Sequence, residues 1–416
     1  MGFDCRQVVA GFLTITMFVM LGHMIKRDHF DSIHVRLSET SDPDGFTDSS
    51  KSLDKSISKY EGAWKEETEE LKPCWSKPDL DDVEESKGYV TFSLTNGPEY
   101  HVSQIADAVV VARSLGATLV LPDIRGSKLG QRRTFGEIYD VKKFIRSLNG
   151  VVRVAKSLPD NVQKFAAVAV PNRVTEDYIA EHIEPVYRKK GNIKLSIHFH
   201  SVNMKKSDTK GNLDSIACLG MFGTLELQPA IQEVVDSMVE RLRTLSRKSD
   251  GHFVAIDLRV DILESKGCQE NEASEAKSCY DAMEIADFLQ KTGFDKSITI
   301  YLTQTVWHSS LDPLKEFFPK TYTKEGIMPA DKKLKFLNED SAEFQEAIDF
   351  YICSESDVFV PAISGLFYAN VAGKRIAAGK TQILVPATIP EKSAQASEFL
   401  SHYITKKNHF AYSCFC

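Results

Sequence analysis

The sequence predicts an α/β protein whose core is a pair of Rossmann-like domains facing a cleft. Residues 88–123 form one complete strand, loop, helix and strand pattern, and a second alternating pattern begins at Phe253. The length of 416 residues exceeds what one hydrophobic core usually serves. We therefore expect an N-terminal domain over residues 85–245 and a C-terminal domain over residues 246–416.

The first pattern opens with alternating β-branched and aromatic residues over 88–94, which predict a strand that the turn residues Thr95-Asn96-Gly97-Pro98 end. Apolar residues at helical spacing predict a helix over 102–115, closed by Gly116, and the apolar run 117–121 predicts a buried strand. Unpaired N–H groups at such a helix start can bind phosphates or sugar hydroxyls. A loop without a ligand is an equal alternative, because fold does not set function.

The second half repeats the alternation. Strands and helices are expected over residues 253–258, 282–292, 297–303, 311–318, 342–353 and 357–361. Ser364-Gly365 then opens a helix that Gly373 ends, with Ser364 as its N-cap. Because ligands bind at the carboxyl ends of parallel strands, we expect Gly97, Arg259 and Gly365 to converge on one cleft.

The N-terminus is expected to be a membrane anchor. Residues 8–25 are almost wholly apolar and approach the ~20 residues that span a bilayer, and no small-residue cleavage site follows them. We expect residues 1–7 to be a cytosolic tail and residues 26–84 a disordered, acidic and Ser-rich stem. The short tail before a large body favours a single-pass type II protein.

The charge and the cysteines limit the function classes. The net charge of −7 arises in the stem, so nothing indicates nucleic-acid binding by the body. The eight cysteines include no C-x-x-C motif. In an oxidising lumen, we expect Cys268 and Cys279 to form a disulfide across a polar loop. Cys5 would lie in the cytosol, which leaves an odd number of luminal cysteines, so at least one luminal thiol would stay free or form a disulfide between molecules.

Asp257-Leu258-Arg259 ends the strand that starts at Phe253. A guanidinium at this place can bind a diphosphate through two parallel hydrogen bonds and neutralise it as it leaves. The alternative is a structural ion pair with Asp257 or Asp261.

Three segments together resemble the plant O-fucosyltransferase-like superfamily: residues 88–123, the strand end at Arg259 with Cys268 beyond it, and residues 357–375. Within it, the anchor, the NGPEYHVS loop and the AYSCFC ending are most similar to the MANNAN SYNTHESIS-RELATED proteins. The resemblance implies a Golgi type II protein with a two-domain GT-B fold that acts in wall mannan synthesis by an inverting, metal-independent transfer.

The chain departs from the superfamily at several positions. The usual Gly-Gly-Leu-Asn-Gln-Gln-Arg loop is Asn96-Gly97-Pro98-Glu99-Tyr100-His101-Val102, and the usual His-x-Arg is Asp257-Leu258-Arg259. Ser364-Gly365-Leu366 stands for Asp-Gly-Asn, whereas Gly373 and Arg375 persist. The resemblance therefore implies retained phosphate binding but leaves the sugar and the acceptor open.

Two function classes follow. The first is a glycosyltransferase in which Arg259 stabilises the leaving diphosphate and Glu99 is the candidate base that takes the acceptor's proton. The alternative, which the altered loop favours, is that Glu99 is a surface residue. The second is a non-catalytic partner of a mannan synthase. The residues expected to contact the nucleotide sugar are Asn96, Gly97, Asp257, Arg259, Asp357, Ser364, Gly365 and Arg375.

The expected ligands are a GDP-sugar, in preference to a UDP-sugar, and a polysaccharide acceptor, with no cofactor and no metal. Asp79-Leu80-Asp81 and Asp42-Pro43-Asp44 lie in the stem, and His198-Phe199-His200 lacks a third ligand nearby in the sequence. None of these motifs therefore predicts a metal site.

Overall fold

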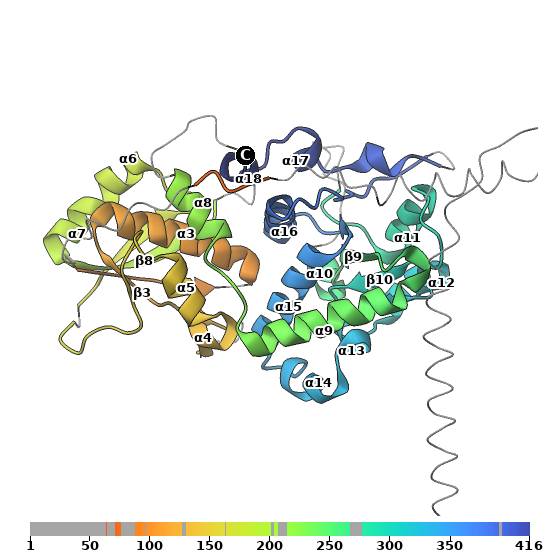
Figure 1. The fold of residues 1–416 in the computed structure, drawn as a ribbon, viewed down its shortest axis with the longest axis horizontal. Coiled ribbons are helices and arrows are strands. Elements are labelled where there is room, and N and C mark those ends of the chain that lie inside the picture. The colour runs from red at the N-terminus through yellow and green to blue at the C-terminus, as the bar shows by residue number, and fades with distance from the viewer. Residues whose placement is uncertain are drawn as a thin grey trace, which may run out of the picture. The chain divides into compact units, whose positions relative to one another are not determined.

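A computed structural model describes residues 64, 71–75, 88–95, 97–126, 130–162, 164–200, 204–206, 214–266, 277–390 and 393–416 (Figure 1). All of them belong to one compact unit, residues 54–416. The predicted anchor over residues 8–25 and most of the predicted stem lie outside the described residues. Among the helices that are described, none has both the length and the apolar character needed to cross a bilayer.

The first α/β half is built on a five-stranded parallel sheet of order β6-β3-β1-β8-β7. Its strands are β1 (Tyr89–Thr91), β3 (Thr118–Val120), β6 (Val154–Ala155), β7 (Ala166–Pro171) and β8 (Asn192–His198). Its helical segments are α3 (Pro98–Leu115), α4 (Phe135–Ile138), α5 (Val141–Ser147), α6 (Glu176–Tyr178), η2 (Ile179–Ile183), α7 (Glu184–Lys190) and α8 (Asp214–Phe222).

The first predicted strand is divided in the structure. After β1 the chain leaves the sheet at Phe92 and forms β2 (Ser93–Thr95) in a small second sheet with β4 (Asp123–Arg125) and β5 (Arg132–Thr134). The helix α3 starts at Pro98, four residues before the predicted start at Val102. A proline suits the first helical position because its missing N–H would have no partner there. Gly116 ends α3 at φ 60°, as predicted.

The second α/β half is built on a four-stranded parallel sheet of order β11-β10-β9-β12. Its strands are β9 (Phe253–Asp257), β10 (Thr299–Leu302), β11 (Thr321–Tyr322) and β12 (Val358–Pro361). The surrounding helices are α9 (Pro229–Leu245), α10 (Val260–Lys266), α11 (Ala282–Lys291), α12 (Asp312–Phe317), α13 (Lys324–Ile327), α14 (Ala330–Phe336), α15 (Ala342–Glu355) and α16 (Leu366–Ala377). The predicted α/β class with parallel sheets is confirmed.

Helix α16 continues past Gly373, where the sequence predicted its end. A Cβ at Gly373 would lie 2.6 Å from Cε1 of His409 and 3.3 Å from Cε1 of Phe222. Glycine at this position therefore allows the buried His409 ring and α8 to pack directly against the helix.

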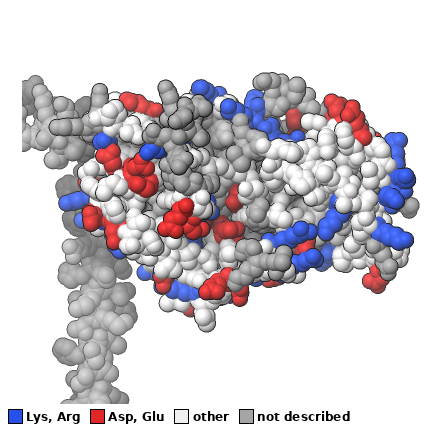
Figure 2. All heavy atoms as spheres, turned by 180° about the vertical axis from the view of Figure 1, so that it is seen from behind, with Lys and Arg blue, Asp and Glu red and all other residues white. Residues whose placement is uncertain are grey.

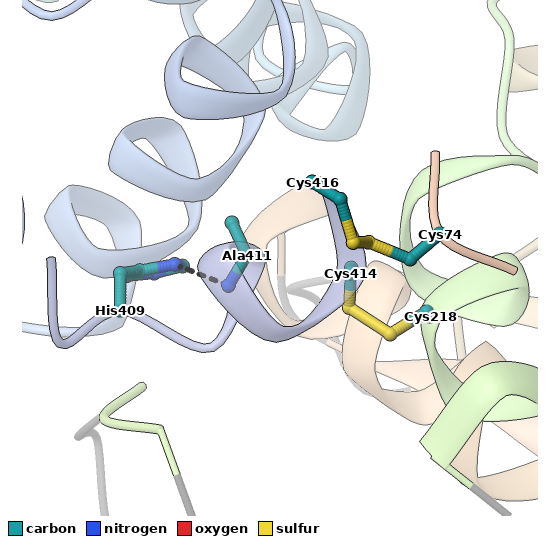
Figure 3. The surroundings of a disulfide bond; sticks show 6 residues. All are labelled: Cys74, Cys218, His409, Ala411, Cys414 and Cys416. Atoms are coloured by element: carbon teal, nitrogen blue, oxygen red, sulfur yellow. Dashed lines mark hydrogen bonds between the residues drawn. A yellow bond between two sulfur atoms is a disulfide. The ribbon is translucent and has the colours of Figure 1, made fainter. Parts of the chain in front are cut away.

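The C-terminal residues are joined covalently to the first half (Figure 3). After α17 (His402–Thr405), the short helix α18 (Ala411–Cys414) ends at a disulfide from Cys414 to Cys218 of α8, and Cys416 is bonded to Cys74. The Cys74 N–H also donates to the Cys414 carbonyl at 2.8 Å. Neither pairing was predicted, because the partners are 196 and 342 residues apart in the chain.

Two further cysteines bear on the predictions. Cys279 is disulfide-bonded, but the position of its partner lies outside the described residues, so the predicted pairing with Cys268 stays a prediction. Cys353 is a free, buried thiol, which agrees with the expected unpaired cysteine.

Figure 2 shows the face opposite to that of Figure 1, where both signs of charge are present. Basic side chains gather at the edge of the first half, where the last turn of α7 carries Arg188, Lys189 and Lys190. Acidic side chains gather over the second half.

Candidate active site at the ends of β9 and β12

The candidate site lies where two neighbouring strands of the second sheet end. Strands β9 and β12 are parallel neighbours, with Asp257 opposite Pro361 at their carboxyl ends. Strands β10 and β11 lie on the other side of β9, so the strand order reverses between β9 and β12. Ligands of open α/β sheets bind outside the strand ends at such a reversal. Arg259, two residues beyond β9, is placed at this point.

The Arg259 side chain is held from two sides. Its Nε lies 3.2 Å from Oδ1 of Asp257, and its guanidinium carbon lies 5.2 Å from the centre of the Phe367 ring on α16. Within the described part of the chain, neither Nη group has a hydrogen-bond acceptor, and the side chain is 21% exposed. The predicted alternative, an ion pair with Asp257, is therefore present, yet it leaves the outer edge of the guanidinium available for an anion.

Asp257 is a positioning residue for Arg259. It is fully buried at the end of β9 and accepts a hydrogen bond from Oγ1 of Thr303 at 3.0 Å. Burial disfavours the charge on Arg259, but the carboxylates around it, Asp257 foremost and then Glu99, raise its pKa above the ordinary value. The guanidinium therefore stays charged and correctly oriented without a ligand.

A buried polar network supports the strand ends. Nζ of Lys324 donates to the Thr303 carbonyl at 2.6 Å and to Oδ2 of Asp349 at 2.5 Å, and the Tyr301 hydroxyl donates to Oδ1 of Asp349 at 2.7 Å. Burial raises the pKa of Asp349, while Lys324 opposes the change. Sequence reasoning missed both residues, because an isolated Lys or Asp carries no local signal of its partner.

Glu99 extends from the first turn of α3 toward this site. Its main-chain carbonyl accepts a hydrogen bond from Nδ2 of Asn370 on α16 at 2.9 Å, so the two helices are linked where they lie side by side (Figure 1). Its Oε2 is buried and has no hydrogen-bond partner. Burial, followed by repulsion from Glu346, raises the pKa of Glu99 to about 8.

Glu346 of α15 is a second carboxyl group that the sequence did not indicate. Burial raises its pKa to about 7, against the attraction of Arg259. A Cβ at Gly97 would lie 2.3 Å from Oε2 of Glu99 and 3.0 Å from Oε2 of Glu346. Two carboxyl groups approach Gly97 too closely for any larger residue. This packing explains the glycine without a ligand, although Gly97 was predicted to contact the nucleotide sugar.

The cluster of Arg259, Glu99 and Glu346 has two chemical capacities. The guanidinium can bind and neutralise an anionic group such as a diphosphate. The pKa values of the two neighbouring carboxyl groups are raised to about 8 and about 7, so the groups can take up or release a proton near neutral pH.

Asp357 and Arg375 lie away from this cluster, which corrects two predictions. Asp357 precedes β12 at the amino edge of the sheet, where Oδ2 accepts from the Phe253 N–H at 2.9 Å and Oδ1 lies 3.0 Å from Nδ1 of His252. Arg375 is fully buried and donates to the main-chain carbonyls of Cys353, Ser356, Asp357 and Gln382. Both residues hold β12 in place, and neither faces the strand ends at which a nucleotide would bind.

The helix start after β12 also differs from the prediction. Gly365, at φ 146°, is the N-cap of α16, and no side chain caps the helix. The Ser364 hydroxyl instead donates to the Ser278 carbonyl at 2.8 Å, so Ser364 is not the N-cap that was expected. Gly365 remains at the carboxyl end of β12, whereas Asn96 lies outside the described residues.

The comparison with protein families decides the classification. Residues 89–378 match the O-FucT family, described as GDP-fucose protein O-fucosyltransferase. The chain belongs to the O-FucT family. The resemblance seen in the sequence is thereby confirmed.

This O-FucT member has full-length plant relatives. It is 59% identical over 422 residues to Protein MANNAN SYNTHESIS-RELATED 1 of Arabidopsis thaliana, with 100% of both chains covered. It is 50% identical over 420 residues to Protein MANNAN SYNTHESIS-RELATED of Trigonella foenum-graecum, with 99% of both covered. O-fucosyltransferase 29 of A. thaliana is 28% identical over 338 residues, 72% of this chain and 60% of that one.

Among solved structures, the α-1,6-fucosyltransferase NodZ soaked with GDP-fucose has a TM-score of 0.44 at 14% identity, covering 73% of this chain and 98% of that one. POFUT1 in complex with GDP has a TM-score of 0.42 at 14% identity, covering 73% and 99%.

The raised carboxyl pKa values of this O-FucT member predict a pH-dependent stability. An unfolded chain releases the Glu99 proton above its ordinary pKa of 4.5, whereas the folded protein keeps it until about pH 8. The folded state binds more protons between these values, so this group makes stability fall as the pH rises. We expect Glu99→Gln to lessen the loss of unfolding free energy between pH 5 and 8 by about 3 kcal/mol.

Urea unfolding of the wild type and the variant at both pH values measures the difference. The exposed Glu339 provides a matched control, and Glu339→Gln should leave the pH dependence unchanged. Equal pH slopes for the wild type and Glu99→Gln would show that Glu99 is ionised in the folded protein.

Proposed function

We propose that the protein is a glycosyltransferase that takes its donor from a nucleotide sugar bound at Arg259. The observation that carries the proposal is the charged guanidinium, fixed at the carboxyl ends of β9 and β12 beside the Glu99–Glu346 pair, with no acceptor on its Nη groups among the described residues. The family's description names GDP-fucose, which supports a GDP-sugar in preference to a UDP-sugar. The names of the full-length relatives support a role in cell-wall mannan synthesis, with a polysaccharide as the acceptor.

The proposed reaction is an inverting, metal-independent transfer within a GT-B-like pair of domains. An acceptor hydroxyl oxygen attacks the anomeric carbon from the side opposite to the diphosphate. The bond from that carbon to the diphosphate oxygen breaks, and Arg259 stabilises the negative charge that the leaving group gains. The hydroxyl proton passes to the carboxylate of Glu99 or Glu346, whichever is ionised.

We propose further that residues 8–25 anchor the protein in the Golgi membrane in type II orientation, with residues 85–416 in the lumen. The paired cysteines Cys74–Cys416 and Cys218–Cys414 support an oxidising compartment. Protease treatment of sealed vesicles tests the orientation. Digestion of the body from the cytosolic side would contradict it.

One observation favours a second candidate, a non-catalytic partner of a mannan synthase. With a pKa of about 8, Glu99 is mostly protonated at pH 7 and is then no base. Such a protein would bind the nucleotide sugar, or only the synthase, without transferring a glycosyl unit.

The test combines binding and turnover on the full-length protein in detergent. Calorimetric titration with a panel of GDP- and UDP-sugars identifies the donor, and release of the free nucleotide with a manno-oligosaccharide acceptor reports transfer. We expect one GDP-sugar to bind and to be consumed. Binding without consumption would select the accessory function, and no binding of any donor would reject both nucleotide-dependent proposals.

A further inference from the structure

A pocket whose lining does not include Arg259 lies between helices of the two halves. It has a volume of about 330 Å³ and is lined by residues of α3, α8, α15 and α16 together with Pro73, Trp75 and Phe415. On α15, the pocket residue Ser354 is eight positions beyond Glu346 of the candidate active site, or about 12 Å along the helix. The pocket lining therefore includes none of Arg259, Glu99 and Glu346, although its residue Asn370 donates to the Glu99 carbonyl.

One wall of the pocket is aromatic and covalently braced. The Trp75 and Phe415 rings meet edge to face at 5.1 Å, and Phe222 contacts Phe415 in the same way at 5.4 Å. The disulfide between Cys74 and Cys416, the chain neighbours of Trp75 and Phe415, joins the two segments of this wall (Figure 3). Because the wall is apolar and held in place, it offers a preformed surface for a flat hydrophobic group.

The pocket lining also includes a lysine, Lys374, that forms no ion pair with a described residue. Nζ of Lys374 lies 4.5 Å from the centre of the Tyr351 ring, and no described residue accepts a hydrogen bond or forms an ion pair with it. Burial lowers the pKa of Lys374, with Glu355 the main opposing influence. Glu355 itself lies 3.6 Å from Nζ of Lys380, so the pocket lining holds two lysines, Lys374 and Lys380, against one carboxylate.

We propose that this pocket binds an organic anion, with an aromatic body against Trp75, Phe222 and Phe415 and one carboxylate, sulfonate or phosphate group on Lys374. A charged group in a partly desolvated pocket gains most from a direct ion pair, since water screens the pair little there. The pocket volume of about 330 Å³ accommodates one or two fused rings. This inference does not depend on the proposed transferase activity.

Anilinonaphthalene sulfonate is a suitable probe, because it joins an aromatic body to a single negative charge and fluoresces when it leaves water. We expect saturable binding to the full-length wild-type protein, and a loss of affinity of about tenfold or more in Lys374→Met, as for the loss of a charge-assisted hydrogen bond. The exposed Lys406 gives the matched control: Lys406→Met should bind as the wild type does.

Two further measurements separate this pocket from other sites. The uncharged analogue N-phenylnaphthylamine should bind the wild type and Lys374→Met equally, because only the ion pair is removed. GDP should not displace the sulfonate. Displacement by GDP, an unchanged affinity in Lys374→Met, or no saturable binding by the wild type would each overturn the proposal.

A variant on another part of the pocket covers the case in which Lys374→Met unfolds. Ala378, which is exposed at the pocket's edge, can be replaced by tryptophan to fill the space. Ala378→Trp should abolish binding of both probes while its thermal unfolding matches that of the wild type. Retained binding in a folded Ala378→Trp protein would show that the probe lies elsewhere.

Discussion

Replacing Arg259 with lysine is expected to lower nucleotide-sugar binding or transfer about ten- to a hundred-fold and to leave the fold intact. Lysine keeps the positive charge but loses the planar fork that can hold two phosphate oxygens at once. It also loses the Nε group that lies 3.2 Å from Asp257, so the remaining cation is no longer held at the strand end. The substitution therefore tests whether the geometry of the guanidinium, and not only its positive charge, is needed at this position.

Expression of Arg259→Lys in a mannan-deficient plant background, at a protein level equal to the wild type, measures the effect through restored wall mannan. Arg188→Lys is the control, because Arg188 is 76% exposed and, among the described residues, its ion pair is with Glu184 of its own helix. An exposed ion pair contributes at most about 1 kcal/mol, so this control should restore mannan fully. Full restoration by Arg259→Lys as well would show that Arg259 binds no diphosphate.

Replacing Arg375 with leucine is expected to destabilise the protein by at least about 3 kcal/mol. The buried guanidinium donates to the Cys353, Ser356 and Gln382 carbonyls at 3.2, 2.5 and 3.0 Å. Leucine fills part of the volume but removes all of these hydrogen bonds. The Cys353 and Gln382 carbonyls keep donors in the Ser356 hydroxyl and the Phe359 N–H, whereas no other described group donates to the buried Ser356 carbonyl, whose desolvation is then uncompensated. The end of α15 and the start of β12 would lose their common support.

Chemical unfolding of Arg375→Leu and of Arg188→Leu, the exposed control, gives the difference in unfolding free energy. Donor binding by the folded fraction of Arg375→Leu should equal that of the wild type. An unchanged unfolding free energy would contradict the structural role. If a fully folded Arg375→Leu protein no longer bound the nucleotide sugar, Arg375 would have the nucleotide-binding role that the sequence predicted.

Much of the second half could be predicted from local pattern. The apolar run at Phe253 and the periodicity of residues 282–292 specify β9 and α11, because alternation and helical spacing act over a few neighbouring residues. The position of Arg259 followed from the same pattern, since a residue just past a buried parallel strand must lie at its carboxyl end.

Other features were decided by the tertiary structure. Glu346 meets Glu99 only because α15 and α3, far apart in the chain, pack together, and the disulfides join cysteines separated by 196 and 342 residues. Arg375 and Arg259 are equally basic in the sequence, but one is buried among carbonyls and the other stays 21% exposed. The sequence by itself determined β9, β10, β12, α11 and the strand end that carries Arg259, because these depend on near neighbours. Which charged groups share the site depends on contacts between distant segments, and only the folded chain brings those together.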